Sequence, residues 1–329
     1  MIISRTPFRI SFFGGGTDYP AWYENHGGMV LNATINKYAY ITVRELPPFF
    51  DYKYRIQYYL KEEVGSLEEI KHPVVREAAK LLNISKGLEI VHNADLPARS
   101  GLGSSSTFTV GMFHALYAMK NRMVTKRELA LAAINLEQNI IGEAVGSQDQ
   151  TAAAFGGVNL ISFNKQQTFE VQTLTVSQER IDELQDNLLL CFTGFSRTAE
   201  KVAKAQIKAT PKKEKELNMM LDILNEAKNT ILDKNCSLDN FGELLNKQWH
   251  LKRELTNQIT NNEIDKIYNK GMNAGAIGGK LLGAGGGGFM LFYANKQHHE
   301  KIKSALEDKL FVPFRFEKTG SQIIYYSHD

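Results

Sequence analysis

The chain has 329 residues, of which 43% are hydrophobic and 23% are charged, and this is the composition of an ordinary globular protein. A formal net charge of +3 gives no basis for nucleic-acid binding, and no apolar run approaches the length of a membrane span. We therefore expect neither a nucleic acid nor a membrane as a partner. The two cysteines, Cys191 and Cys236, exclude a disulfide framework and favour a reducing compartment. Because residues 1–9 also lack the apolar stretch of a signal peptide, we expect a cytoplasmic protein.

The length suits two domains, and the pattern of elements predicts where they meet. In the first part we expect strands over 8–13, 29–43 and 88–92, helices over 74–82 and 126–145, and a strand after a glycine turn at 156–162. The pattern becomes polar and loses its period over 165–187, and an apolar strand begins at Leu188. We therefore predict an N-terminal domain over 1–180 and a C-terminal domain over 181–329. The second should contain helices over 198–233, 239–257 and 263–275, a strand over 288–293, and a last helix and strand.

The segment 97–109, Pro-Ala-Arg-Ser-Gly-Leu-Gly-Ser-Ser-Ser-Thr-Phe-Thr, is the most informative part of the chain. Gly101 and Gly103 permit backbone conformations and close approaches that a Cβ would prevent. Helical spacing follows at once, so the glycine turn leads into a helix N-terminus, whose unpaired N–H groups and dipole favour an anion. We interpret the segment as a nucleotide-phosphate loop, although not a Walker A loop, because no lysine follows the glycines. The alternative interpretation is a serine-capped helix after an ordinary turn.

Two further glycine clusters flank this segment in the sequence. The first, Gly14-Gly-Gly-Thr-Asp18, is either a plain turn or a ligand loop in which Asp18 accepts hydrogen bonds from hydroxyl groups. The second, Gly283-Ala-Gly-Gly-Gly-Gly288, is so rich in glycine that we expect a loop closing against a ligand, since glycines lose much entropy on folding. It contains a formal Gly-X-Gly-X-X-Gly, but a strand follows it rather than the helix that a dinucleotide site requires.

Three charged residues become candidates only in combination with these loops. Asp149 lies in an otherwise small and uncharged stretch, Glu137 lies beside the apolar stripe of its helix, and Arg9 follows Pro7 and Phe8. Taken one at a time, Asp149 is better explained as a turn or cap residue and Glu137 as a boundary glutamate, and Arg9 could be an ordinary strand-end arginine.

Together and in this order, these segments resemble the GHMP kinases, the superfamily of galactokinase, homoserine kinase, mevalonate kinase and phosphomevalonate kinase. The central motif of the superfamily is Pro-X-X-X-Gly-Leu-X-Ser-Ser-Ala, and residues 97–106 match it with Ser106 in place of alanine. The resemblance covers essentially the whole chain. It implies an α+β fold with a ribosomal protein S5 domain 2-like N-terminal ATP-binding domain and a ferredoxin-like C-terminal domain, and an active site in the cleft between them.

The resemblance also implies cofactors, ATP and Mg²⁺, and roles for individual residues. Ser105 and Glu137 would coordinate Mg²⁺, which prefers oxygen ligands. Asp149 would act as the base or orienting carboxylate for the attacking hydroxyl, and Arg9 would neutralise charge at the reacting centre. The ATP phosphates would be held by Arg99, Ser100, Gly101, Leu102, Gly103, Ser104, Ser105 and Ser106. The substrate would contact Gly14, Gly15, Gly16, Thr17, Asp18, Gly283, Ala284 and Gly285.

A narrower resemblance concerns the substrate. Galactokinases carry Gly-Glu-His-Thr-Asp-Tyr in the first cluster, whereas residues 14–19 lack the Glu-His pair, which disfavours galactose. Residues 7–20, with 26–28 and 34–37, look like the D-glycero-D-manno-heptose 7-phosphate kinases, which phosphorylate the anomeric hydroxyl to the 1,7-bisphosphate on the route to nucleotide-activated heptose. The phosphate already on such a substrate needs a basic partner, and the candidates are Lys37, Arg99, Arg197 and Lys201.

The sequence leaves two alternative functions open. One is another GHMP sugar 1-kinase, fucokinase-like or galactokinase-like. The other is a non-catalytic nucleotide- or sugar-binding sensor, which would be expected to lack the base or the metal ligands, yet Asp149, Glu137 and Ser105 are all present. The sequence also leaves open whether the chain forms a homodimer.

Overall fold

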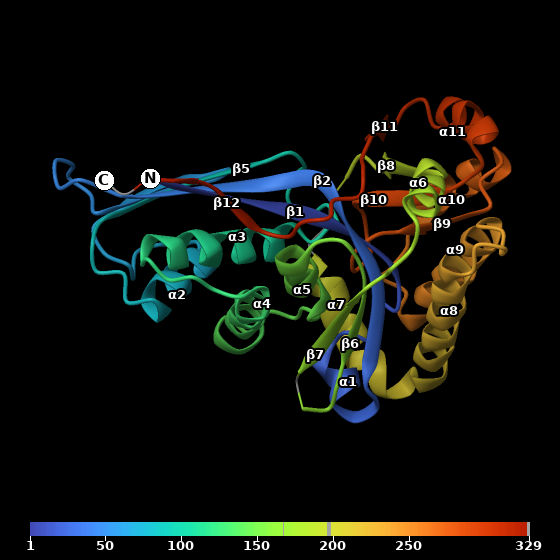
Figure 1. The fold of residues 1–329 in the computed structure, drawn as a ribbon, viewed down its shortest axis with the longest axis horizontal. Helices are drawn as coiled ribbons and strands as arrows, with labels where there is room; N and C mark the ends of the chain where they lie inside the picture. Colours follow the sequence, from blue (N-terminus) through green and yellow to red (C-terminus); the bar gives the residue numbers. More distant parts are fainter. Residues whose placement is uncertain (167, 196–198, 328–329) are drawn as a thin grey trace.

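The N-terminal part of the chain forms a large mixed sheet, and helices α2 to α5 cover one of its faces (Figure 1). The computed structural model describes residues 1–166, 168–195 and 199–327. Within them, this sheet has eight strands along the path β12-β1-β2-β5-β3-β4, with β6 on β2 and β7 on β6. Its strands are β1 (Ile2–Phe13), β2 (Gly28–Glu45), β3 (Tyr54–Gln57), β4 (Lys61–Val64), β5 (Leu88–Ala94), β6 (Val158–Phe163), β7 (Phe169–Thr173) and β12 (Gln322–Tyr326). Its helices are α1 (Pro20–His26), α2 (Pro73–Leu81), α3 (Ser104–Met119), α4 (Lys126–Asn135), a π-helical turn (Leu136–Ile140) and α5 (Gln148–Phe155).

Helix α3 is buried over most of its length and lies directly on strands β1 and β2. A glycine makes the close approach possible, because a Cβ at Gly111 would lie 2.8 Å from the hydroxyl oxygen of Thr6. The Ser4 hydroxyl donates to the Gly111 carbonyl oxygen at 2.8 Å and ties the helix to the sheet. This packing fixes the N-terminus of α3, which begins at Ser104 directly after the glycine turn.

The second sheet is antiparallel and has the order β11-β8-β10-β9. The chain order of strand, helices, two strands, helix and strand is the βαββαβ pattern of a ferredoxin-like domain. This confirms the predicted α+β fold. The strands are β8 (Leu188–Phe192), β9 (Gly278–Leu281), β10 (Phe289–Tyr293) and β11 (Leu310–Phe311). The helices are α6 (Gln178–Asp186), α7 (Ala199–Ala209), α8 (Glu214–Leu232), α9 (Asp239–Leu255), α10 (Asn262–Asn273) and α11 (His299–Ala305), with 3₁₀ turns at Thr210–Lys212 and Lys296–His298.

The last strand corrects the predicted domain limits. The change from one sheet to the other falls between β7 and β8, near the expected boundary at residue 180. Strand β12, however, pairs antiparallel with β1, from Ile2 opposite Tyr326 to Arg5 opposite Gln322. The C-terminal end therefore lies in the first sheet and near the N-terminus (Figure 1), so 181–329 is not one continuous domain. The pairing gives the otherwise unpaired edge of β1 a partner.

Two predicted helices are interrupted. The expected helix over 198–233 is divided into α7 and α8 by the turn at Thr210–Lys212, which contains Pro211. Proline has no N–H to donate and is unfavourable in a helix interior, which explains the break. The expected helix over 126–145 ends in the single π-helical turn that contains Glu137. Such turns occur frequently at functional sites.

None of the described helices combines the length and the apolar character that a membrane span requires. The cytoplasmic location and the homodimer stay predictions.

Candidate active site

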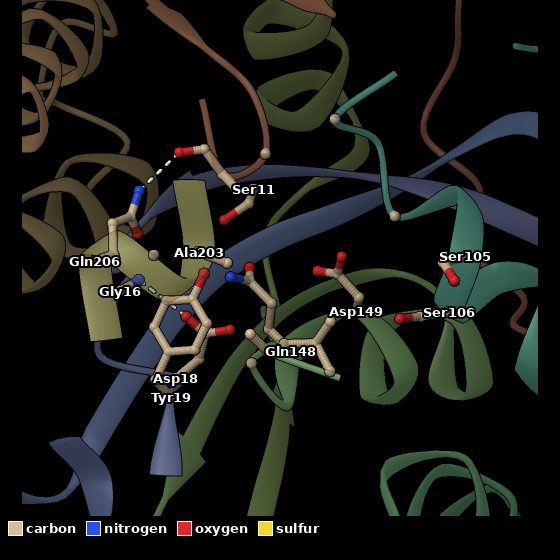
Figure 2. A pocket seen from close by; sticks show the side chains of 18 of the residues that line it. Ser11, Gly16, Asp18, Tyr19, Ser105, Ser106, Gln148, Asp149, Ala203 and Gln206 are labelled. Atoms are coloured by element: carbon tan, nitrogen blue, oxygen red, sulfur yellow. Dashed lines mark hydrogen bonds between the residues drawn. The ribbon is translucent and has the colours of Figure 1, made fainter. Parts of the chain in front are cut away.

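A cavity of about 350 Å³ lies where the two domains meet. Strand β1, the glycine turn before α3, and helices α3 and α5 line it from the first domain, while α7, α9 and strand β9 line it from the second. Figure 2 shows these side chains converging on one space. The predicted site residues in its wall are Arg9, Gly15, Gly16, Asp18, Arg99, Gly101, Gly103, Ser104, Ser105, Ser106, Asp149, Gly283 and Ala284.

The predicted phosphate loop is built by positive backbone angles and close packing. Arg99, Gly101 and Gly103 have φ of 59°, 81° and 80°, in the region that favours glycine. A Cβ on Gly103 would lie 3.3 Å from Asp149 Oδ2, so this glycine lets the loop approach the catalytic candidates. The first N–H groups of α3 have no partner within the helix and lie at the cavity wall, where an anion would bind.

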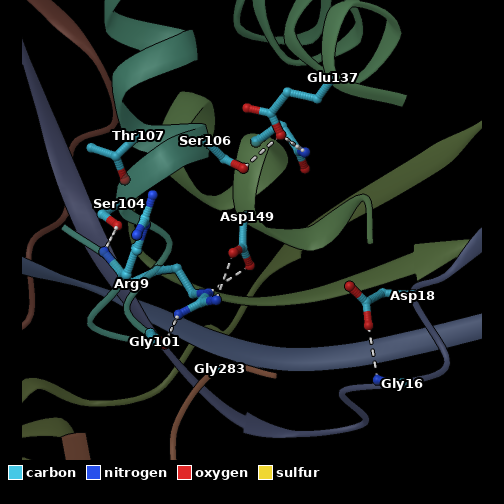
Figure 3. A network of polar contacts seen from close by, with 12 residues as sticks. Arg9, Gly16, Asp18, Gly101, Ser104, Ser106, Thr107, Glu137, Asp149 and Gly283 are labelled. Atoms are coloured by element: carbon cyan, nitrogen blue, oxygen red, sulfur yellow. Dashed lines mark hydrogen bonds and ion pairs between the residues drawn. The ribbon is translucent and has the colours of Figure 1, made fainter. Parts of the chain in front are cut away.

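Two of the residues predicted to hold the ATP phosphates do not line the cavity, because their side chains are buried, and their contacts with phosphate stay predictions. Ser100 and Leu102 are both fully buried and do not line it. The Leu102 carbonyl oxygen instead accepts a hydrogen bond from Arg9 N at 3.1 Å, which fastens the loop to β1. Ser104 also stabilises the loop, because its hydroxyl accepts a hydrogen bond from Arg99 N at 3.0 Å (Figure 3).

Arg9 and Asp149 form the central contact of the site. Arg9 Nε donates to Asp149 Oδ1 at 2.7 Å, and a terminal nitrogen donates to Oδ2 at 2.6 Å (Figure 3). The other terminal nitrogen donates to the Gly101 carbonyl oxygen at 2.8 Å. This geometry brings together the two residues that the family resemblance assigns to catalysis. It also joins them to the glycine turn, so that the carboxylate and the loop are held in one fixed arrangement.

Glu137 does not line the cavity itself but lies directly behind Ser106, which does. It is fully buried and accepts hydrogen bonds from the Ser106 hydroxyl at 2.8 Å and from the Gln150 amide (Figure 3). Its hydroxyl partner is therefore Ser106, whereas Ser105 is exposed to the cavity. Burial raises the pKa of Glu137 to about 7, and the charge of Glu143 adds to the rise.

The first glycine cluster divides into structural and cavity-facing residues. Gly15, Gly16 and Asp18 line the cavity, but Gly14 and Thr17 do not. Thr17 is fully buried, and its hydroxyl donates a hydrogen bond to the Gly14 carbonyl oxygen at 2.8 Å. Thr17 therefore stabilises the turn. Asp18 Oδ1 accepts a hydrogen bond from Gly16 N at 2.9 Å. Burial raises the pKa of Asp18, and the charge of Asp149 adds to this rise. The hydrogen bond from Gly16 N acts in the opposite direction and lowers the pKa.

The third cluster also contributes only in part. Gly283 and Ala284 line the cavity, and the Ala284 carbonyl oxygen accepts a hydrogen bond from Gln206 at 2.7 Å (Figure 2). Gly285 faces away, because a Cβ there would lie 2.8 Å from the Cα of Ile259. Gly285 is not part of the cavity wall, so its contact with the substrate stays a prediction.

Of the basic residues predicted for the substrate phosphate, Arg99 lines the cavity. Lys201 is exposed on α7 and points elsewhere, since Glu200, Ala203 and Gln206 form the face of that helix that lines the cavity. Lys37 does not line it either, and Arg197 lies outside the described residues.

Two lysines in the cavity wall were missed by the sequence analysis. Lys252 on α9 is 5% exposed and Lys280 on β9 is 2% exposed. Burial lowers the pKa of both, that of Lys252 to about 8, and the charge of Arg9 acts in the same direction. The sequence could have indicated a special role for Lys280, because it is the sole charged residue between Lys270 and Lys296. The indication for Lys252 is weaker: it falls on the buried face of its helix with Gln248 and Leu255.

Comparison with known proteins agrees with this geometry. The family models for the GHMP kinases N terminal domain and GHMP kinases C terminal match residues 70–157 and 234–312. The chain is 31% identical to the D-glycero-alpha-D-manno-heptose 7-phosphate kinase of Campylobacter jejuni, over 97% of each chain. It is also similar to the crystal structure of a D-glycero-D-manno-heptose 1-phosphate kinase from Bacteroides thetaiotaomicron, with a TM-score of 0.79, 24% identity and 100% coverage of both chains. The Lactococcus lactis galactokinase complexed with galactose gives a TM-score of 0.76 at 19% identity, over 98% of this chain and 94% of that one. These matches show that the chain belongs to the GHMP kinase family, and the glycine turn before α3 and the Arg9–Asp149 pair agree with that assignment.

Proposed function

We propose that this chain is an ATP-dependent sugar kinase that phosphorylates the anomeric hydroxyl of D-glycero-D-manno-heptose 7-phosphate to the 1,7-bisphosphate. The similarity to a kinase named for heptose 7-phosphate, at 31% identity over 97% of both chains, is the observation that carries the choice of substrate. The chemistry is supported by the position of the Arg9–Asp149 pair in one cavity with the glycine turn and with Asp18.

In the proposed reaction, the anomeric oxygen attacks the γ-phosphorus of ATP, and the bond from that phosphorus to the bridging oxygen of ADP breaks. Asp149 orients the attacking hydroxyl and accepts its proton. Arg9 holds this carboxylate by two hydrogen bonds, so its position is set before the substrate arrives. The N–H groups at the start of α3 bind the phosphates of the nucleotide. Asp18 and the cavity-lining backbone of Gly15 and Gly16 form the sugar side of the site.

Mg²⁺ is the metal that we propose alongside ATP. No group of three or more His, Cys, Asp or Glu side chains that could hold a metal occurs among the described residues. Mg²⁺ commonly takes one or two carboxylates and completes its ligands with phosphate oxygens and water. Ser105 faces the cavity, and Glu137 Oε1 is buried without a hydrogen bond among the described residues, so both fit such an ion. When bound, the ion would neutralise charge on the nucleotide phosphates.

Replacing Glu137 with glutamine is expected to raise the Mg²⁺ concentration needed for half-maximal activity, because the ion loses one anionic ligand. The measurement is a Mg²⁺ titration of phosphorylation rate at constant ATP. Glu143→Gln is the matched control, since Glu143 lines the cavity and its charge acts on Glu137. An unchanged titration curve for Glu137→Gln would show that this glutamate is a buried structural residue.

The substrate is tested by measuring kcat/KM for heptose 7-phosphate, unphosphorylated heptose, mannose, L-fucose and galactose with ATP. We expect heptose 7-phosphate to give the highest value. Faster turnover of an unphosphorylated sugar would contradict the proposal and indicate another sugar 1-kinase. A fucokinase-like enzyme is the first alternative, because a bifunctional fucokinase/GDP-fucose pyrophosphorylase of Arabidopsis thaliana is 26% identical over 92% of this chain and 31% of its own. ATP binding without any phosphorylated product would support a sensor.

A further inference from the structure

Lys252 is a buried cation that faces the cavity without a counter-ion. It is 5% exposed, and among the described residues it makes no ion pair within 4.0 Å. Its Nζ donates one hydrogen bond to the Gly283 carbonyl oxygen. An ammonium group has three hydrogens, so two remain for other partners. A buried charge without a partner is unfavourable, and a side chain of this kind is expected where a ligand brings the opposite charge.

The two other buried cations in the cavity wall, Arg9 and Lys280, already have partners within the protein. Arg9 is paired with Asp149 through both carboxylate oxygens, so its charge is matched within the protein. Lys280 donates to the carbonyl oxygens of Ser11 at 2.9 Å and Phe12 at 2.6 Å, which leaves it one hydrogen. Of the two buried lysines in this wall, Lys252 therefore has the larger unused hydrogen-bonding capacity, while Arg99, which also lines the cavity, is exposed.

The backbone contacts of Lys252 place it beside the phosphate loop. Its partner Gly283 packs on the loop so closely that a Cβ there would lie 2.5 Å from the Cα of Gly101. Gly101 is the residue whose carbonyl oxygen accepts the third hydrogen bond of Arg9, at 2.8 Å. The charges of Arg9, Asp18 and Asp149 all act on Lys252. The lysine thus lies between the loop and the residues proposed for the acceptor.

We propose that Lys252 is a further catalytic residue, which contacts the phosphoryl group while it passes from ATP to the acceptor. The proposal rests on the proposed kinase function but not on the identity of the sugar. Phosphoryl transfer is accelerated mainly by positioning and by cations that neutralise the oxygens of the transferred group. Because Arg9 is paired with Asp149 and Arg99 is exposed to solvent, Lys252 is the buried cation that supplies positive charge to this group.

The test compares Lys252→Met, which removes the charge at similar length, with Lys252→Arg, which keeps it. The matched control is Lys247→Met, an exposed lysine on the same helix. With the best acceptor of the wild type, Lys252→Met should lower kcat by about 10²-fold or more, whereas KM for ATP and acceptor should change little. Lys252→Arg should recover part of kcat, and Lys247→Met should match the wild type. The comparison of kcat/KM among the five sugars identifies the substrate independently. An error in the proposed sugar therefore does not affect the test of Lys252.

A second readout separates catalysis from a structural role. Fluoroaluminate with ADP and Mg²⁺ imitates the transferred phosphoryl group and should tighten ADP binding to the wild type. Lys252→Met should lose this tightening by at least about tenfold while it binds ADP alone normally and keeps its melting temperature, because the variant removes an unfavourable buried charge. The proposal is overturned if the variant unfolds at a lower temperature and loses ADP binding, or if kcat is retained while only KM for a phosphorylated acceptor rises. The latter result would place the lysine on the phosphate of the acceptor.

Discussion

Replacing Asp149 with asparagine is expected to lower kcat by roughly 10²- to 10⁴-fold while the affinity for ATP stays close to that of the wild type. Asparagine preserves the shape of the side chain, but its amide does not accept a proton at neutral pH. The change also leaves Arg9 without its anionic partner, because the two hydrogen bonds at 2.7 and 2.6 Å both end on this carboxylate. The loss should therefore appear in kcat, since the nucleotide is held mainly by the loop before α3.

Steady-state kinetics and a nucleotide titration measure the two parts of this prediction. Glu200→Gln is the matched control, because Glu200 also lines the cavity but lies on α7 and makes an exposed ion pair with Lys204. It removes the same charge and should leave kcat nearly unchanged. Full activity of Asp149→Asn would remove Asp149 from the mechanism, and a loss confined to ATP affinity would assign it to nucleotide binding.

Replacing Gly101 with alanine is expected to weaken ATP binding at least about tenfold and to destabilise the fold by about 1–3 kcal/mol. Two physical causes act together. The backbone of Gly101 has φ of 81°, which is unfavourable for a residue with a Cβ. The new Cβ would also lie 2.5 Å from the Leu282 carbonyl oxygen, and because this atom belongs to the backbone of the second domain, it has little freedom to move. The loop must therefore shift away from the geometry that binds phosphate.

Gly27→Ala separates the two causes. Gly27 has a similar φ of 74°, but the nearest atom to a Cβ there is 3.6 Å away, which is an ordinary contact. This variant should show only the conformational cost, about 1–3 kcal/mol because its ψ of 159° is also unfavourable for a residue with a Cβ, with normal ATP affinity. Denaturant unfolding and ATP titration give both quantities. Equal behaviour of the two variants would mean that the contact between the loop and Leu282 is unimportant.

The local chemistry of the site was determined by the sequence. The order of glycines and serines over 97–106 predicted a phosphate loop leading into a helix, and α3 begins at Ser104 as expected. Such features depend on neighbours a few residues away, on positive φ at glycine and on helical periodicity, so they can be inferred without a fold. The family resemblance likewise named Arg9 and Asp149, and the structure brings the two into contact.

The tertiary structure decided which members of each motif reach the ligand space. Four members of the predicted motifs do not line the cavity, because the surrounding packing buries Ser100, Leu102 and Thr17 and places the backbone of Gly285 against Ile259. Lys201 lies one residue from Glu200, but that step rotates it off the face of α7 that lines the cavity.

Contacts between distant segments were also fixed only by the fold. Strand β12 pairs with β1 across almost the whole chain, and hydrogen bonds between backbones leave little trace in residue type. Lys252 and Lys280 look like ordinary lysines in the sequence, and their burial results from the way α9 and β9 close over the glycine turn of the other domain. The sequence thus specified the glycine turn and the helix that follows it, whereas the packing of two domains created the charged cavity, because the ionic environment of a side chain depends on atoms that are distant along the chain.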